Sequence, residues 1–149
     1  MENRKKVLVI HGPNLNLLGE RETSVYGKTT MADIDAELVA LGSTIGLDVE
    51  SYQSNVEGEM VNRIQDARGK FSAIIINPGG YTHYSVAIRD AIAAVSTPVV
   101  EVHISNILTR ESFRHESLIG PVCKGSIMGF GLDSYRLGIE SFLKPENIL

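Results

Sequence analysis

The segment FSAIIINPGGYTH at residues 71–83 is the stretch that decides the fold class. Its uninterrupted apolar run, Ala73–Ile76, predicts the middle of a buried strand. The run ends at Asn77, and the Pro-Gly-Gly sequence that follows predicts a turn into an amphipathic helix over Tyr81–Val95. Because a strand that is apolar on both faces must be covered on both faces, this unit indicates a parallel sheet packed between helices.

The same alternation of apolar and amphipathic stretches runs through the whole chain. We expect five strands, at Lys5–His11, Leu47–Tyr52, Phe71–Asn77, Pro98–Ile104 and Val122–Met128. We expect helices at Thr30–Ile45, Glu57–Arg68, Tyr81–Val95 and Leu132–Leu143. Right-handed crossovers then favour an α/β fold of three layers, a doubly wound parallel sheet with the flavodoxin-like order 2-1-3-4-5. Neither a repeat nor a linker interrupts the pattern, so residues 1–149 are expected to form a single domain.

The composition narrows the classes of function. The net charge is −4 and no basic run is long enough to follow a phosphate backbone, so nucleic acid is not an expected partner. The first apolar run, Val7–Ile10, is too short for a signal peptide or a membrane span. The single cysteine, Cys123, cannot form an intrachain disulfide, which favours a reducing cytoplasm and a structural thiol. The histidines lack the spacing of metal ligands, so no metal is expected.

Polar residues gather where three of the expected strands end. The segments are HGPNLN at residues 11–16, NPGGYTH at 77–83 and EVHISN at 101–106. The carboxyl ends of parallel strands meet at one edge of the sheet, and doubly wound folds bind ligands where the strand order reverses. We therefore expect a small-molecule site in the gap between the first and third strands.

The segment Gly12–Lys28 has no periodic pattern, and loops of this length are usually functional or disordered. It carries Arg21 and Tyr26, and two glycines that could act as hinges, Gly19 and Gly27. A guanidinium held against the phenol would lower the pKa of the tyrosine from its ordinary value of about 10 and make it a base. The alternative is an exposed arginine and a tyrosine packed on a loop.

Two further pairs have both a functional and a structural interpretation. Glu101 and His103 lie two residues apart on a strand and share a face, so the carboxylate could support a protonated imidazole as an acid. In the alternative, His103 is a hydrogen-bonded structural residue. Arg110 and Arg114 are four residues apart and would share the face of a helical turn, where they could bind an anion or form a solvated basic face.

Two other classes of flavodoxin-like protein fit less well. A nucleotide- or phosphate-binding protein would need a Gly- or Ser/Thr-rich loop after the first strand, and residues 12–18 supply Pro, Asn and Leu instead. A signalling receiver would need clustered acids at the same place, and the sequence has none there.

Several motifs, in order along the chain, resemble those of the type II 3-dehydroquinate dehydratases. They are GPNLNLLG at 12–19, Arg21-Glu22 with Tyr26-Gly27, Gln53-Ser54-Asn55 with Glu57-Gly58, Asn77-Pro78-Gly79 with Tyr81-Thr82-His83, and residues 99–107 with Arg110-Glu111 and Phe113-Arg114-His115. The resemblance covers nearly the whole chain, from the first strand to the last helix. Three positions depart from the family pattern: His11 stands where many members have Asn, Thr23 where Pro is frequent, and Gly80 where Ala is common.

The resemblance implies a lyase, without a cofactor, that dehydrates 3-dehydroquinate to 3-dehydroshikimate. Tyr26 would be the base, and Arg21 would lower its pKa. Asn14 would stabilise an enolate through a water, and His103, oriented by Glu101, would be the acid. The substrate-binding positions would be Asn77, His83, Asp90 from a neighbouring subunit, Ile104, Ser105 and Arg114.

The resemblance also implies a homododecamer built from four trimers. A local argument supports assembly, because Asp90 lies seven residues beyond His83 on the expected third helix, about two turns from the strand end. In the alternative, Asp90 is a surface helix residue. The implied pathway is shikimate and aromatic amino acid biosynthesis, and quinate breakdown is the alternative role of the same reaction.

Overall fold

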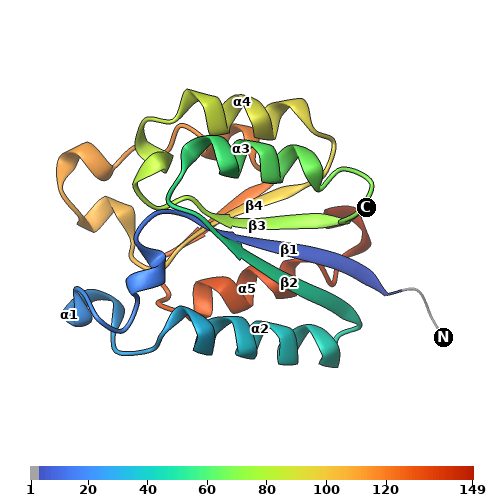
Figure 1. The fold of residues 1–149 in the computed structure, drawn as a ribbon, viewed down its shortest axis with the longest axis horizontal. Helices are drawn as coiled ribbons and strands as arrows, with labels where there is room; N and C mark the ends of the chain where they lie inside the picture. Colours follow the sequence, from blue (N-terminus) through green and yellow to red (C-terminus); the bar gives the residue numbers. More distant parts are fainter. Residues whose placement is uncertain (1–3) are drawn as a thin grey trace.

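The computed structural model describes residues 4–149, apart from the side chains of Val25 and Tyr26 (Figure 1). Its centre is a sheet of five parallel strands in the order β2-β1-β3-β4-β5. The strands are β1 (Lys5–His11), β2 (Leu47–Gln53), β3 (Ala73–Asn77), β4 (Val99–His103) and β5 (Gly125–Met128). The three-layer α/β class and the flavodoxin-like strand order expected from the sequence are confirmed.

Helices cover both faces of the sheet (Figure 1). One face carries α2 (Met31–Thr44) and α5 (Asp133–Ser141), and the other carries α3 (Glu57–Asp66) and α4 (Val86–Ala94). The short α1 (Thr23–Tyr26) lies beyond the carboxyl end of the sheet. Single turns of 3-10 helix occupy Leu15–Leu17, Gly79–His83, Ile107–Thr109, Ser112–Arg114, Gly120–Val122 and Pro145–Asn147. No helix within residues 4–149 is long and apolar enough to span a bilayer.

Two apolar clusters fill the space between the sheet and its helices. Alternate residues of a strand point to opposite faces, so Val7 and Val9 of β1 join the cluster under α2 and α5. Leu8 and Ile10 join the cluster under α3 and α4. All four of these side chains have no exposed surface. This burial on both faces is what the uninterrupted apolar runs of the sequence predicted.

Two local features of the sequence set the boundaries of α2. Thr30 Oγ1 accepts from the backbone N–H of Asp33 at 3.2 Å, and the Asp33 carboxylate accepts from the backbone N–H of Thr30 at 3.1 Å. This reciprocal capping box satisfies two donors that the helix cannot satisfy itself. Gly46 follows the helix with a φ of +82°, a conformation that glycine adopts without steric cost.

The helix expected over Tyr81–Val95 is wrong as a single element. A 3-10 turn occupies Gly79–His83, and Tyr84, with a φ of −151°, breaks the chain direction before α4 begins. Ser85 then caps α4, because its Oγ accepts from the backbone N–H of Ile88 at 3.0 Å. The strand expected over Val122–Met128 starts later, at Gly125, because a 3-10 turn containing a proline precedes it.

The residues after β1 are held tightly against the end of β3. The backbone N–H of Gly12 donates to the carbonyl oxygen of Asn77 at 2.7 Å. A Cβ added at Gly12 would lie 2.5 Å from the carbonyl oxygen of Pro78, a backbone atom that cannot rotate away. Only glycine therefore fits at this approach of two strand ends.

We predict that Gly12→Ala destabilises the protein by about 1–3 kcal/mol, because forced overpacking costs that much. The matched control is Gly58→Ala in α3, where an added Cβ meets no atom within 4 Å. Alanine favours helix over glycine by up to about 1 kcal/mol, so the control should be neutral or stabilising. The free energy of unfolding in urea measures both. Equal stabilities for the two variants would contradict the close approach at Gly12.

Candidate active site

A cavity of about 170 Å³ opens at the carboxyl ends of β1, β3 and β4, which is the edge predicted from the sequence. The predicted site residues that line it are Asn14, Arg21, Asn77, His83, His103, Ile104, Ser105 and Arg114. Glu101 lies behind His103, and Asp90 is exposed on α4 and is not among the lining residues. The side chain of Tyr26 lies outside the described residues.

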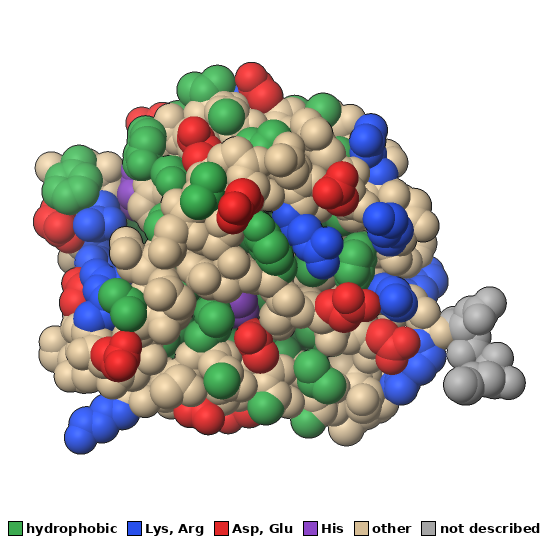
Figure 2. All heavy atoms as spheres, viewed as in Figure 1, with side chains coloured by type: hydrophobic (Ala, Val, Ile, Leu, Met, Phe, Trp, Pro, Cys, Tyr) green, Lys and Arg blue, Asp and Glu red, His purple; other side chains and the backbone are tan. Residues whose placement is uncertain are grey.

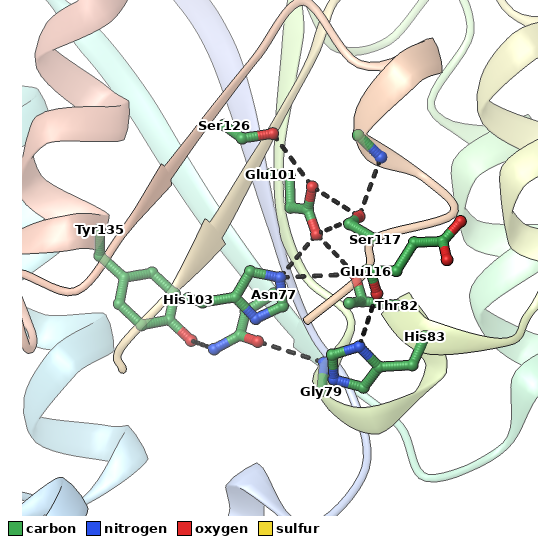
Figure 3. Close-up of polar contacts among 11 residues, drawn as sticks. Asn77, Gly79, Thr82, His83, Glu101, His103, Glu116, Ser117, Ser126 and Tyr135 are labelled. Carbon is green, nitrogen blue, oxygen red and sulfur yellow. Dashed lines mark hydrogen bonds and ion pairs between the residues drawn. The ribbon is translucent and has the colours of Figure 1, made fainter. Parts of the chain in front are cut away.

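The Glu101 carboxylate is the centre of a buried hydrogen-bond cluster (Figure 3). It has no exposed surface, and four side chains point at its two oxygens. Thr82 Oγ1 donates at 2.6 Å, Ser117 Oγ at 2.8 Å and Ser126 Oγ at 3.0 Å. The fourth contact is His103 Nε2, also at 2.6 Å.

The pKa of Glu101 records the balance between burial and these contacts. Burial by itself raises the pKa of the carboxyl group. The hydrogen bond and charge of His103 and the hydrogen bonds of Thr82 and Ser117 outweigh burial, so the pKa lies below its ordinary value. Glu101 is therefore an anion in the folded protein at neutral pH.

The contact with Glu101 fixes which nitrogen of His103 faces the cavity. A carboxylate only accepts hydrogen bonds, so His103 Nε2 must carry the hydrogen of the 2.6 Å contact. Nδ1 is left as the nitrogen available to a ligand, and the side chain reaches the cavity although it is nearly buried. The predicted pairing of Glu101 with His103 on one face of a strand is confirmed. The arrangement fixes the imidazole in one orientation, with one ring nitrogen directed at a bound molecule.

Two further side chains of the cavity have fixed orientations (Figure 3). The Asn77 amide donates from Nδ2 to Tyr135 Oη at 3.0 Å and accepts through Oδ1 from the backbone N–H of Gly79 at 3.2 Å. His83 Nδ1 lies 2.8 Å from the carbonyl oxygen of Glu116. Because a carbonyl oxygen only accepts, Nδ1 carries a hydrogen, and Nε2 is the nitrogen left for a ligand.

The loop after β1 is tied to the end of β2. Gln53 Nε2 donates to the carbonyl oxygen of Gly12 at 3.3 Å and to Asn55 Oδ1 at 3.0 Å. The same Asn55 oxygen accepts from the backbone N–H of Asn14 at 3.0 Å. Asn14 has a φ of +69°, a left-handed conformation that asparagine tolerates better than most residues. These contacts hold the Asn14 backbone at the cavity wall.

Charged side chains form the outer part of the cavity. Arg21 pairs with Glu22, and Arg110 reaches both Glu22 at 3.8 Å and Glu111 at 3.6 Å. Arg114 pairs with the same Glu111 at 3.3 Å. Three guanidiniums against two carboxylates leave an excess of one positive charge, which favours an anionic ligand. In Figure 2 basic and acidic side chains lie side by side at this end of the molecule.

The four-residue spacing of Arg110 and Arg114 predicts one helical turn for both, and this prediction is wrong. Arg110 precedes the 3-10 turn Ser112–Arg114 rather than continuing one helix with it. Both side chains nevertheless line the cavity. Within the described part of the chain, no group of three or more His, Cys, Asp or Glu side chains could hold a metal ion.

The sequence did not indicate several residues that contribute to the site. Ser117 and Ser126 lie in stretches with no motif, and Tyr135 lies within the last helix rather than in a segment directly after a strand. Glu22 directly follows the predicted residue Arg21, and this neighbouring charge was the one available signal. Cys123 is partly buried, and burial together with the charge of Glu101 raises the pKa of its thiol to about 12, which suits a structural thiol.

Comparison with known proteins gives one consistent result. A sequence model of the family described as dehydroquinase class II matches residues 5–143. The 3-dehydroquinate dehydratase of Desulforudis audaxviator is 56% identical over 136 residues, which cover 91% of this chain and 91% of that protein. The type II dehydroquinase structure from Butyrivibrio crossotus has a TM-score of 0.92 at 46% identity, over 95% of this chain and 99% of the other. The type II dehydroquinase from Propionibacterium acnes gives 0.91 at 41% identity, over 96% and 99% of the two chains.

We predict that the Glu101 carboxylate stabilises the fold in a pH-dependent way. Because its folded pKa is depressed, its contribution is complete above the unfolded value of about 4.3 and is lost as the pH falls through the folded pKa. Glu101→Gln should lower the free energy of unfolding at pH 7 by about 1–3 kcal/mol, since buried donors lose their acceptor. The difference from the wild type should shrink below about pH 4.

Urea unfolding at several pH values measures this difference. The matched control is Glu140→Gln on α5, where a partly exposed carboxylate pairs with Arg136, and the change should be at most about 1 kcal/mol. A difference for Glu101→Gln that stays constant from pH 7 to pH 3 would show that the charge of Glu101 is not what the cluster stabilises.

Proposed function

The chain belongs to the dehydroquinase class II family, and on that premise we propose that its cavity dehydrates 3-dehydroquinate to 3-dehydroshikimate by trans elimination through an enolate. The observation that carries the proposal is the His103–Glu101 pair, buried behind a cavity with a cationic rim. The substrate is a small cyclic keto-acid. Its carboxylate suits the excess positive charge of the rim, and its hydroxyl group suits an acid at the cavity wall.

In the proposed first step, Tyr26 takes a proton from the carbon next to the ketone. The electrons of the broken C–H bond move toward the carbonyl oxygen and form the enolate. A tyrosine acts as a base only when its phenolate is stabilised, and Arg21 is the proposed source of that stabilisation. Its support is indirect: Arg21 lines the cavity and lies on the same loop as Tyr26. Asn14, also in the lining, is proposed to stabilise the enolate oxygen through a water.

In the proposed second step, the enolate re-forms the ketone and expels the hydroxyl group as water. The departing oxygen needs a proton, and His103 Nδ1 is proposed to donate it. The hydrogen bond from Nε2 to the Glu101 carboxylate supports this role, because it fixes the ring with Nδ1 toward the cavity. The proton taken by Tyr26 and the proton given by His103 balance, so the enzyme returns to its starting state by exchange with water.

Binding of the substrate is proposed to use groups of fixed orientation. The amide of Asn77 and Nε2 of His83 are available to its hydroxyl groups, and Arg114 lies among the lining residues. The backbone N–H groups of Ile104 and Ser105, directly after β4, are proposed to hold its carboxylate. Pre-set donors of this kind lose little entropy on binding.

We place the reaction in the shikimate pathway, where it serves aromatic amino acid biosynthesis, in a cytoplasmic enzyme that needs no cofactor and has no nucleic acid partner. Quinate breakdown uses the same reaction and is the alternative role. The curated relative with 56% identity carries the name of the reaction and not of a pathway, so it supports the chemistry in both roles equally.

We further propose a homododecamer built from four trimers, in which Asp90 completes the site of a neighbouring subunit. Asp90 is exposed on α4 and does not line the cavity of its own chain. Around the carboxyl end of the sheet, Tyr84, Val86, Leu108 and Phe113 are all more than half exposed. Exposed apolar side chains that gather in one patch mark surfaces that associate with protein.

We predict that Tyr26→Phe and His103→Ala each lower kcat by roughly 10²–10⁴-fold, the usual contribution of a general acid or base. The assay follows the absorbance of the conjugated product formed from 3-dehydroquinate. Tyr52→Phe is the matched control, because the Tyr52 hydroxyl contacts Glu59 outside the cavity. The melting temperature of Tyr26→Phe should stay close to that of the wild type, whereas His103→Ala should melt lower because the buried Glu101 carboxylate loses a donor. A Tyr26→Phe enzyme with near-normal turnover would refute the assignment of the base.

We predict that light scattering after gel filtration gives about twelve chain masses, with trimers as the product of mild denaturant. Asp90→Ala should raise KM even where assembly persists, because the neighbouring site loses a contact. Asp66→Ala, at the end of α3, is the surface control and should leave KM unchanged. A fully active monomer at the assay concentration would overturn both the shared site and the role of Asp90.

A further inference from the structure

A second series of hydrogen-bonded polar side chains, here called the polar chain, lies on the other side of Asn77 from the cavity. Asp35 Oδ1 lies 2.8 Å from His11 Nε2, and His11 Nδ1 lies 3.0 Å from Tyr135 Oη. Tyr135 Oη in turn accepts from Asn77 Nδ2 at 3.0 Å. His11 and Tyr135 have no exposed surface, whereas the side chain of Asp35 is 28% exposed. The chain thus runs from the solvent at α2 to a wall of the cavity.

The elements of the fold explain why these groups meet. His11 and Asn77 are paired in the register of β1 and β3, each as the last residue of its strand. Residues paired across adjacent strands point to the same face, here the face covered by α2 and α5. Asp35 comes from α2 and Tyr135 from α5. A polar chain inside an apolar layer is costly unless every member is satisfied.

The donors and acceptors of the polar chain allow its hydrogen bonds to run in only one direction. The Asp35 carboxylate only accepts, so the hydrogen of the 2.8 Å contact belongs to His11 Nε2. In the neutral ring Nδ1 is then bare and accepts from the Tyr135 hydroxyl. In the described part of the protein, that hydroxyl contacts only His11 and Asn77, so its own hydrogen has no other acceptor. With its hydrogen directed at His11, the oxygen of Tyr135 presents a lone pair to the Asn77 amide.

The hydroxyl of Tyr135 keeps its hydrogen throughout the working range of the enzyme. Burial raises the pKa of the phenol, the hydrogen bond from Asn77 opposes this, and the negative charge of Asp35 raises it further. Tyr135 is therefore a fixed donor toward His11 and a fixed acceptor for Asn77, and it cannot serve as a second base in place of Tyr26.

We propose that Asp35, His11 and Tyr135 are positioning residues that hold the Asn77 amide in one orientation for the substrate. Tyr135 Oη accepts a hydrogen bond from one N–H of the Asn77 amide, and the backbone N–H of Gly79 donates to the amide oxygen. The second amide hydrogen is then the one offered to a ligand in the cavity that Asn77 lines. The inference rests on the proposed function, because it assigns these three residues to the binding of that substrate.

The tautomer of His11 tests the hydrogen arrangement without any assay of activity. Neutron diffraction from crystals exchanged into heavy water should place a deuterium on His11 Nε2 and none on Nδ1. It should also place the Tyr135 deuterium between Oη and Nδ1. A deuterium on Nδ1 would overturn the proposed direction of the chain, whether or not the protein turns over 3-dehydroquinate.

Steady-state kinetics test the positioning role. Tyr135→Phe should raise KM by about 3–10-fold, the worth of one neutral hydrogen bond, and should change kcat less than about 2-fold. In an Asn77→Ala background, the same substitution should change KM less than about 2-fold, because the group through which Tyr135 acts is gone. An equal rise in KM in both backgrounds would mean that Tyr135 only supports the fold, and would overturn the inference.

Substitutions at His11 supply a matched pair. The Oδ1 atom of an asparagine is the same number of bonds from the backbone as Nδ1 of a histidine, so His11→Asn keeps an acceptor for Tyr135. It should hold KM within about 2-fold of the wild type, whereas His11→Leu, which removes the acceptor, should raise KM about 3–10-fold. Equal KM values for the two variants would overturn the role of His11.

The control for the loss of a hydroxyl is Tyr52→Phe, whose side chain packs against the cluster on the other face of the sheet and should leave KM unchanged. Failure of the inference and failure of the proposed function are distinguishable. A wild-type enzyme that does not turn over 3-dehydroquinate removes the proposed function and the positioning role together. An active wild type with unchanged KM in Tyr135→Phe removes the positioning role alone.

Discussion

A carboxylate that is removed from water must be compensated by donors from the protein, and the burial of Glu101 imposes this constraint on the whole site. Its donors come from four separate segments: His103 on the same strand, Thr82 in the turn after β3, Ser117 in the irregular stretch after β4, and Ser126 on β5. Since all four must reach the same two oxygens, the segments cannot shift independently. The result is one orientation for the imidazole that faces the cavity.

Side chains from both faces of the sheet contribute to the cavity. Val100 and Val102 pack on the α2 and α5 side, so by strand alternation Glu101 and His103 belong to the opposite side. Asn77 points to the α2 and α5 side, where Tyr135 holds it. A ligand at the end of the strands can therefore meet groups anchored in two different layers. Each layer supplies its own hydrogen-bond network, and neither network needs residues of the other.

Each arginine of the rim pairs within the protein with Glu22 or Glu111. The pairs Arg21–Glu22 and Arg114–Glu111 are partly exposed, and such pairs contribute little to stability, so an anionic ligand can replace the carboxylate as the partner of the guanidinium at small cost. Glu22 and Arg21 lie on the loop after β1, and Arg110 lies after β4. An ion pair across these two segments brings together parts of the rim that the sheet alone does not connect.

Local patterns determined what the sequence could reveal by itself. Apolar runs and helical spacing gave the five strands and four helices in their order along the chain, and spacing of two on a strand gave the contact between Glu101 and His103. All of these depend on residues that are close in the chain, where backbone geometry alone decides which side chains share a face.

Packing of the three layers decided the contacts between residues that are far apart in the sequence. Ser126 lies 25 residues from Glu101, Tyr135 lies 58 residues from Asn77, and His11 lies 124 residues from Tyr135. The break of the expected third helix at Tyr84 likewise positions Thr82 under Glu101. No periodic pattern records such contacts, because the distance between two side chains on different elements depends on how helices and sheet pack together, and that packing is a property of the whole chain.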